Sequence, residues 1–168
     1  MEYTSKDGFP YYFELAKNGT LQSVFSEIAM FSLLHTIDEE RTNYRYEPDK
    51  WSVKQVVGHI IDHERIKMFR AFQLSRKENI ELWGYDQERL VKEGRFNELS
   101  LQSLLTDFVN VRKASMSFID GLSQEQLLRK GFARKYEVTL EQFLRSIIGH
   151  ERHHLNVLKE KYGVIFSE

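Results

Sequence analysis

Histidine is the residue type with the clearest chemical potential in this 168-residue chain, because five of the six histidines fall in two short stretches. The first stretch holds His59 and His63, and the second holds His150, His153 and His154. A spacing of four residues, as in His59/His63 and His150/His154, places two imidazoles one turn apart on the same side of a helix. Imidazole is a common ligand of transition-metal ions, and one ion can be held at this spacing. The pattern therefore predicts a metal site built on two helices.

Helical periodicity identifies two of the expected ligands but leaves the third open. His154 falls within the apolar face of its segment and His150 lies at the edge of that face, whereas His153 is expected to face solvent or a partner. The segment that contains His59 and His63 is apolar on nearly every side, so periodicity does not choose between these two. Any one of these rings, taken alone, could also be a hydrogen-bonded core histidine without a metal.

Two other kinds of metal centre use motifs that the sequence contains in part. Residues 150–154 form His-Glu-x-x-His, the zinc-protease motif, with Glu151 as a candidate general base. Only 14 residues follow His154, none of them histidine, and no strand is expected that could hold a peptide. A di-iron carboxylate bundle needs two Glu-x-x-His motifs, and the chain supplies one. Both alternatives are weaker than a site made of imidazoles.

Four amphipathic helices account for most of the chain and must position these rings. Apolar residues recur every three or four positions in four segments, at about 20–38, 51–74, 101–121 and 139–163. Ser52 or Asp49 is the expected cap of the second helix, and Thr139 opens the fourth with a capping signature. A short extra helix is expected at about 123–129, and no segment alternates with a period of two. The sequence predicts an all-α four-helix bundle in one domain, 1–168.

A long crossover of about residues 76–99 joins the second and third of these helices. It contains Trp83 and Tyr85. A connection of this length with aromatic residues is expected either to serve function or to fill an opening at one end of the bundle.

The second and fourth helices also echo one another in sequence. Ile-Ile-Asp-His-Glu-Arg in the second corresponds to Ile-Ile-Gly-His-Glu-Arg in the fourth, and the histidine follows the helix cap at the same offset in both. This repetition indicates a pseudo-twofold relation that pairs His63 with His150. Such symmetry alone does not make either residue a ligand.

Composition narrows the function classes. Lys and Arg number 24 and Asp and Glu 25, so the net charge of −1 argues against a dedicated nucleic-acid binder. The absence of cysteine excludes disulfides, thiolate metal sites and cysteine nucleophiles. No apolar run approaches the roughly 18 residues of a membrane helix, and the first residues lack the pattern of a signal peptide. We therefore expect a cytoplasmic protein without a membrane partner.

The sequence resembles the DinB/YfiT-like superfamily of metal-dependent four-helix bundles, which is unrelated to the DNA polymerase of the same name. The likeness runs over about residues 12–162. It is carried by the entrance to the second helix, both histidine motifs and the aromatic crossover, at residues 44–46, 50–54, 57–62, 84–86, 96 and 149–155.

This resemblance implies one divalent transition-metal ion held by His59, His150 and His154, and it favours His59 over His63. At His63 the chain departs from similar sequences. Three neutral imidazoles leave a coordination position open, which is typical of catalytic sites. Zinc or nickel is expected before iron or copper, although the ligand type does not name the metal. Asp62 and Glu151 are the nearest candidates for orienting the rings or moving protons.

The resemblance also implies a function. Some relatives are thiol S-transferases that pass bacillithiol or mycothiol onto an electrophile in detoxification or stress response, and others are described as metal-dependent hydrolases. We expect the transferase, with a small electrophile and a low-molecular-weight thiol as partners, in a homodimer. The alternatives are a hydrolase that uses a metal-bound hydroxide and a non-catalytic binding module.

Overall fold

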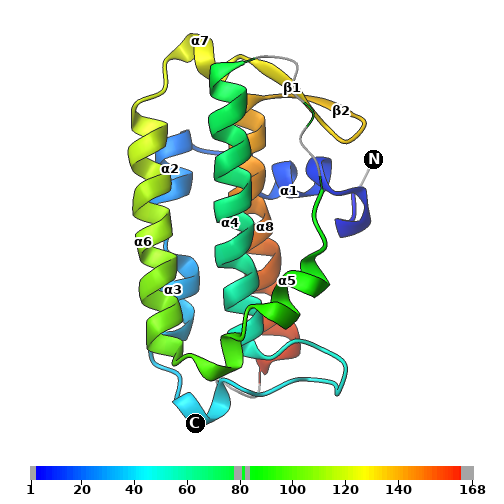
Figure 1. Ribbon diagram of the computed structural model, residues 1–168, viewed down its shortest axis with the longest axis vertical. Helices are drawn as coiled ribbons and strands as arrows, with labels where there is room; N and C mark the ends of the chain where they lie inside the picture. The colour runs from blue at the N-terminus through cyan, green and yellow to red at the C-terminus, as the bar shows by residue number, and fades with distance from the viewer. Residues whose placement is uncertain (1–2, 78–80, 82–83, 164–168) are drawn as a thin grey trace.

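Long helices arranged side by side dominate the computed structural model, which describes residues 3–77, 81 and 84–163 (Figure 1). The long helices are α4 (Val53–Arg76), α6 (Leu101–Asp120) and α8 (Leu140–Lys161). The shorter ones are α1 (Phe9–Leu15), α2 (Leu21–Ser26), α3 (Ala29–Leu34), α5 (Gln87–Glu93) and α7 (Gln124–Leu127). Single 3-10 turns lie at Ser5–Asp7, Glu39–Arg41 and Phe96–Glu98. The predicted all-α bundle is confirmed.

Side-chain caps set where the predicted helices begin. Ser52 accepts a hydrogen bond from the backbone of Gln55 at 3.1 Å, and Gln55 accepts one in return from the backbone of Ser52. Thr139 opens α8 with the same reciprocal pair, and so does Ser123 at the short helix α7. Each cap satisfies two of the four N–H groups that a helix start leaves without partners. Of the two caps expected for the second helix, Ser52 is the observed one.

The first predicted helix, 20–38, is broken in the structure. Glu27 is extended (φ −67°, ψ 129°), and α2 and α3 lie end to end beside α6 (Figure 1). The break frees backbone carbonyls from the helical ladder, and Arg112 of α6 donates to two of them, those of Phe25 (3.4 Å) and Glu27 (2.6 Å). A long-range contact therefore compensates a break that local periodicity does not predict.

The expectation that the chain lacks strands is wrong. β1 (Lys130–Ala133) and β2 (Tyr136–Thr139) form an antiparallel hairpin in which Lys130 pairs with Thr139 and Ala133 with Tyr136. In β1 the buried positions are Gly131 and Ala133, whereas Phe132 is exposed. The buried residues are small and the exposed one is aromatic, so no apolar/polar alternation marks the strand in the sequence.

The helix α1, which the periodicity does not predict, packs across α8 at Gly149. A Cβ atom at this position would lie 1.7 Å from the backbone oxygen of Tyr12. The closeness of the two backbones therefore depends on the absence of a side chain at residue 149. This contact brings Tyr11 and Tyr12 next to the second histidine stretch.

Gly149→Ala is expected to reduce the free energy of unfolding by about 1–3 kcal/mol, because α1 must move away from α8. Denaturant titration followed by circular dichroism measures this change. Gly121→Ala is the matched control, since its Cβ would meet nothing closer than 3.5 Å. Equal effects of the two substitutions would contradict the close-packing argument.

The connection between α4 and α6 carries helix α5 and a 3-10 turn. Phe96 in this turn packs against Gly58 of α4, where a Cβ would lie 2.3 Å from the phenyl ring. The hydroxyl of Tyr85, just before α5, lies 2.7 Å from Nδ1 of His63. Trp83, the other aromatic residue singled out in this segment, lies outside the described residues.

A layer of buried polar side chains divides the hydrophobic core into two clusters. One cluster includes Val57 and Leu104, and the other includes Leu74 and Phe143. Along α4, α6 and α8 the polar layer falls between the two clusters and consists of His63, Glu64, Arg112, Ser115, His150 and Glu151. Burial of polar groups costs free energy unless they are paired, so packing alone does not explain the residue types of this layer.

None of the helices in the described part of the chain is long and apolar enough to cross a membrane.

Candidate metal centre

Three imidazoles from two antiparallel helices converge at one point of the bundle. Nε2 of His150 lies 3.1 Å from Nε2 of His59 and 3.2 Å from Nε2 of His154. One ring nitrogen from each of the three residues falls within 4.8 Å of the other two. His59 comes from α4, and His150 and His154 lie one turn apart on α8. The structure therefore brings together the three histidines that the resemblance singled out.

The chemistry of this cluster matches a metal ion better than it matches a hydrogen-bonded core. A neutral imidazole has one N–H donor and one lone pair, so three converging nitrogens cannot all be satisfied by one another. Two imidazoles on a tetrahedral ion lie about 3.3 Å apart at metal–nitrogen distances of roughly 2.0–2.1 Å. The observed distances at His150 are close to this value. The other ring nitrogen of His150, Nδ1, is buried and has no hydrogen-bond partner among the described residues, and an ion bound at Nε2 would not provide one.

The surroundings keep the rings neutral, which is the form that binds metal. Burial lowers the pKa of His59 to about 4, and it holds the pKa values of His150 and His154 well below their ordinary range. The indole of Trp51 packs 4.7 Å from the ring of His59, and Tyr12 packs edge-on 5.2 Å from His150. These aromatic neighbours exclude water from two sides of the cluster and fix the ring orientations.

His63 adjoins the cluster but does not share its point of convergence. Its ring stacks flat on that of His150, with centroids 3.6 Å apart and planes 8° apart. Its Nδ1 lies 2.7 Å from the hydroxyl of Tyr85. The sequence echo paired His63 with His150, and in the structure this pair meets ring to ring. His63 therefore links the cluster to the connection that precedes α5.

His153 was expected to face solvent or a partner, and the structure places it against α1. Its Nδ1 lies 3.1 Å from the hydroxyl of Tyr11, and its ring is half-buried. The helix α1 therefore covers this side of α8.

The two carboxylates proposed to orient the rings have other partners in the structure. Glu151 is buried and accepts a hydrogen bond of 2.5 Å from Nη2 of Arg112. Asp62 is half-buried and lies 3.8 Å from Arg65 in an ion pair. Among the described residues, no hydrogen bond joins either carboxylate to one of the three imidazoles of the cluster.

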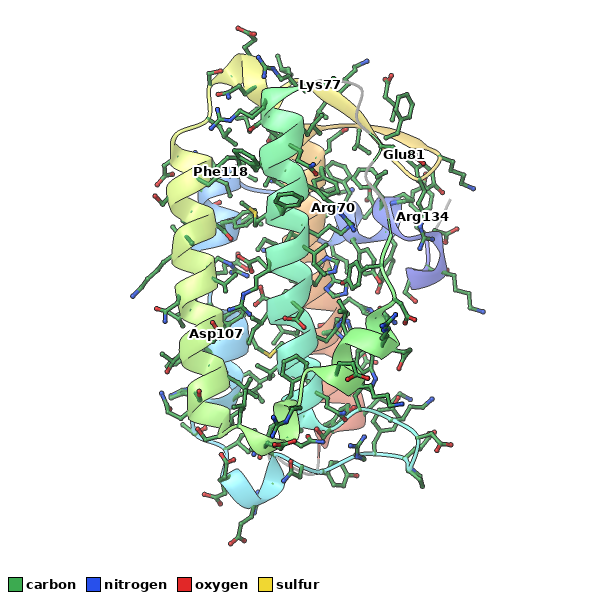
Figure 2. All side chains as sticks on the ribbon, viewed as in Figure 1. Arg70, Lys77, Glu81, Asp107, Phe118 and Arg134 are labelled. Atoms are coloured by element: carbon green, nitrogen blue, oxygen red, sulfur yellow. The ribbon has the colours of Figure 1, made fainter. Side chains whose placement is uncertain are left out.

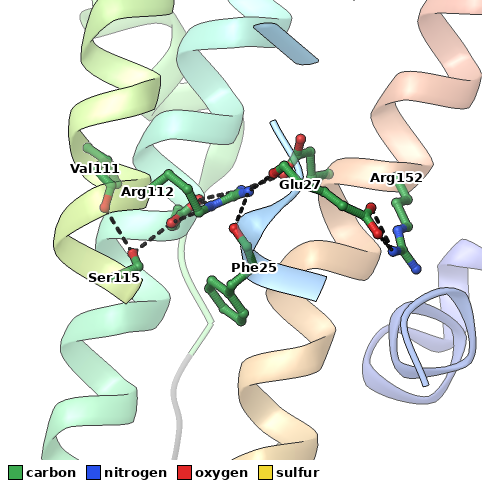
Figure 3. A network of polar contacts seen from close by, with 8 residues as sticks. Phe25, Glu27, Val111, Arg112, Ser115 and Arg152 are labelled. Atoms are coloured by element: carbon green, nitrogen blue, oxygen red, sulfur yellow. Dashed lines mark hydrogen bonds and ion pairs between the residues drawn. The ribbon is translucent and has the colours of Figure 1, made fainter. Parts of the chain in front are cut away.

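Arg112 is a buried charged residue beside the candidate site that the sequence did not lead us to expect. It lies in the buried network of Figure 3, donating to Glu64 at 2.9–3.2 Å as well as to Glu151, while Ser115 donates to Glu64 at 2.6 Å. The sequence contains a signal for it, because Phe108, Arg112, Ser115 and Ile119 share one helical face that is otherwise apolar. A cation in that position needs a buried partner.

Comparison with known proteins agrees with this architecture. The family model of the DinB superfamily matches residues 26–158. The chain belongs to the DinB superfamily. No curated protein matches this DinB-superfamily sequence.

Two solved structures from Bacillus subtilis share the fold of this superfamily member. YfiT, described as a probable metal-dependent hydrolase with an unusual four-helix bundle topology, superposes with a TM-score of 0.71 at 18% identity, over 97% of this chain and 92% of YfiT. A DinB-like protein, YjoA, superposes with a TM-score of 0.51 at 14% identity, over 95% of this chain and 87% of YjoA. At such low identity these matches establish the DinB/YfiT-like fold of the chain.

Proposed function

We propose that this DinB-superfamily chain is a metal-dependent enzyme in which His59, His150 and His154 hold one divalent transition-metal ion. The observation that carries this proposal is the convergence of three neutral Nε2 atoms, those of the buried His59 and His150 and of the half-buried His154, that cannot satisfy one another. Zinc or nickel is the expected ion, before iron or copper, although all four accept imidazole ligands and the ligand type does not select among them. Three protein ligands leave room for a small molecule on the same ion.

The reaction we propose is transfer of a low-molecular-weight thiol onto a small electrophile. A divalent ion at the cluster would favour the ionised form of a thiol that it binds. The thiol must come from a cosubstrate, because the chain has no cysteine. The sulfur forms a bond to the electrophilic carbon, the leaving group departs with its bonding electron pair, and the thiol proton passes to solvent.

The environment of the cluster supports a nucleophile that needs no carboxylate base. Glu151, the base of the His-Glu-x-x-His interpretation, is held by Arg112, and Asp62 is paired with Arg65. Hydrolysis is the second candidate, favoured by the fold shared with YfiT, which is described as a probable metal-dependent hydrolase. The two reactions differ in whether turnover requires an added thiol.

Protein purified without a histidine tag and reconstituted with zinc or nickel tests this assignment. We expect the chain to convert a chromogenic aryl halide only when a thiol such as cysteine or bacillithiol is present. The His59→Ala/His154→Ala double variant is expected to reduce the rate to that of the uncatalysed reaction. Thiol-independent cleavage of a chromogenic ester would instead identify a hydrolase. A metal-loaded protein inactive in both assays would indicate a binding module.

A further inference from the structure

A pocket of about 400 Å³ opens directly beside the metal centre. His150 and His63 form part of its wall, so the pocket reaches the cluster from the side where these two rings stack. The wall continues along α4 through Lys67 and Arg70. Lys67 follows His63 by four residues and Arg70 follows Lys67 by three, so the three side chains lie on the same side of the helix. Arg134, at the tip of the hairpin, also lines the pocket.

Positive charge predominates in this pocket. Figure 2 labels Arg70 and Arg134 on the side of the bundle that carries the hairpin and the N-terminal segment. Among the described residues, the charged groups of the wall are the cations Lys6, Lys67, Arg70 and Arg134 and the single carboxylate of Asp7. That carboxylate is already engaged, because it accepts hydrogen bonds from the backbone and hydroxyl of Thr4 at 2.8 and 3.0 Å.

Three of these cations, Lys67, Arg70 and Arg134, lack acidic partners in the described part of the chain. Lys67 contacts the ring of Phe143, with Nζ 4.9 Å from the centroid. Arg70 lies over the ring of Tyr85 and donates to the carbonyl of Gly84 at 3.4 Å. Within residues 3–77, 81 and 84–163, no ion pair joins Lys67, Arg70 or Arg134 to a carboxylate.

Holding these cations together without an anion costs free energy. Burial, together with the charges of Arg70 and Arg134, lowers the pKa of Lys67 to about 8. Arg134 adopts φ 57°, a left-handed conformation that glycine adopts at less cost. A bound anion would offset the repulsion through charge-assisted hydrogen bonds from all three side chains.

We infer that this pocket binds the anionic group of the substrate, so that the small molecule brought to the metal centre carries a carboxylate or a phosphate. The inference deepens the proposed function and rests on it, because a molecule bound in this pocket is a substrate only if the chain is an enzyme. The anion site itself is built from Lys67, Arg70 and Arg134, none of which belongs to the three-histidine cluster.

Calorimetric titration with two simple probes, inorganic phosphate and succinate, tests the site at constant ionic strength. Both metal-free and zinc-loaded protein are titrated, and zinc content is measured on the same samples. We expect both forms to bind at least one probe. Lys67→Met and Arg70→Met should each weaken that binding about tenfold or more, as for the loss of a charge-assisted hydrogen bond. The tighter probe indicates whether the substrate carries a carboxylate or a phosphate.

Two further variants make the result decisive. Lys113→Met removes one positive charge from the exposed surface of α6 and should leave probe binding unchanged. Arg134→Gly removes a pocket cation while relieving the left-handed backbone, so it should fold normally and still weaken binding. Equal affinity in all variants, or no binding to the metal-free protein, would overturn the inference. A lack of zinc binding with intact anion binding would instead count against the metal centre alone.

Discussion

The His59→Ala/His154→Ala double variant is expected to lose nearly all bound metal, falling from about one equivalent of transition metal per chain to below about a tenth. His150 would then be the only remaining imidazole of the cluster, and a single imidazole does not hold a divalent ion against water and buffer. Either single substitution should leave two ligands and an intermediate affinity. Mass spectrometry of metal content, on protein purified without a histidine tag, measures the loss.

The matched control is His35→Ala, which removes an exposed histidine at the end of α3. It should retain the metal content of the parent protein. Metal retained by the double variant would show that another group, such as His63, holds the ion. A parent protein without metal after incubation with zinc and nickel would contradict the three-histidine centre altogether.

The parts of the fold that the sequence predicts are those with local causes. Ser52 and Thr139 begin their helices through hydrogen bonds to residues three positions away, and apolar spacing within α4, α6 and α8 marks the buried faces. The pairing of His63 with His150 also follows from sequence. Both residues lie 11 positions after a helix cap, and α4 and α8 run in opposite directions (Figure 1).

The choice between His59 and His63 has no local cause. Because α4 is buried on several sides, its own periodicity does not show which ring faces α8 at the level of His154. The antiparallel packing decides this: with His63 level with His150, the residue one turn earlier, His59, comes level with His154. Sequence patterns of a single helix carry no such information about its neighbour.

The remaining differences come from contacts between distant segments. The first predicted helix breaks at Glu27, whose carbonyl accepts a hydrogen bond from Arg112, 85 positions further along the chain. The partner that Glu151 requires is the same arginine, 39 positions away. A charged residue on an apolar helix face signals that a partner exists, but its identity depends on which helices become neighbours.

Arg112→Met is expected to lower the free energy of unfolding by about 3–5 kcal/mol, because it leaves the carboxylates of Glu64 and Glu151 buried without their cation. The backbone carbonyl of Glu27 also loses its donor. Methionine preserves most of the side-chain volume, so the effect reports on charge rather than on a cavity. Denaturant unfolding at neutral pH, followed by circular dichroism, measures it.

Two comparisons separate the buried network from ordinary ion pairs. Arg65→Met removes an arginine that pairs with Asp107 at 2.6 Å on the surface, and it should cost no more than about 1 kcal/mol because solvent screens exposed pairs. Combining Arg112→Met with Glu64→Gln and Glu151→Gln should recover part of the loss, since the uncompensated negative charges are then gone. If Arg112→Met costs no more than Arg65→Met, or if the triple variant is less stable than the single one, burial of unpaired carboxylates is not the cause. Partial recovery would instead identify Arg112 as the charge that allows two acids to lie inside the bundle, one of them next to a histidine of the candidate metal centre.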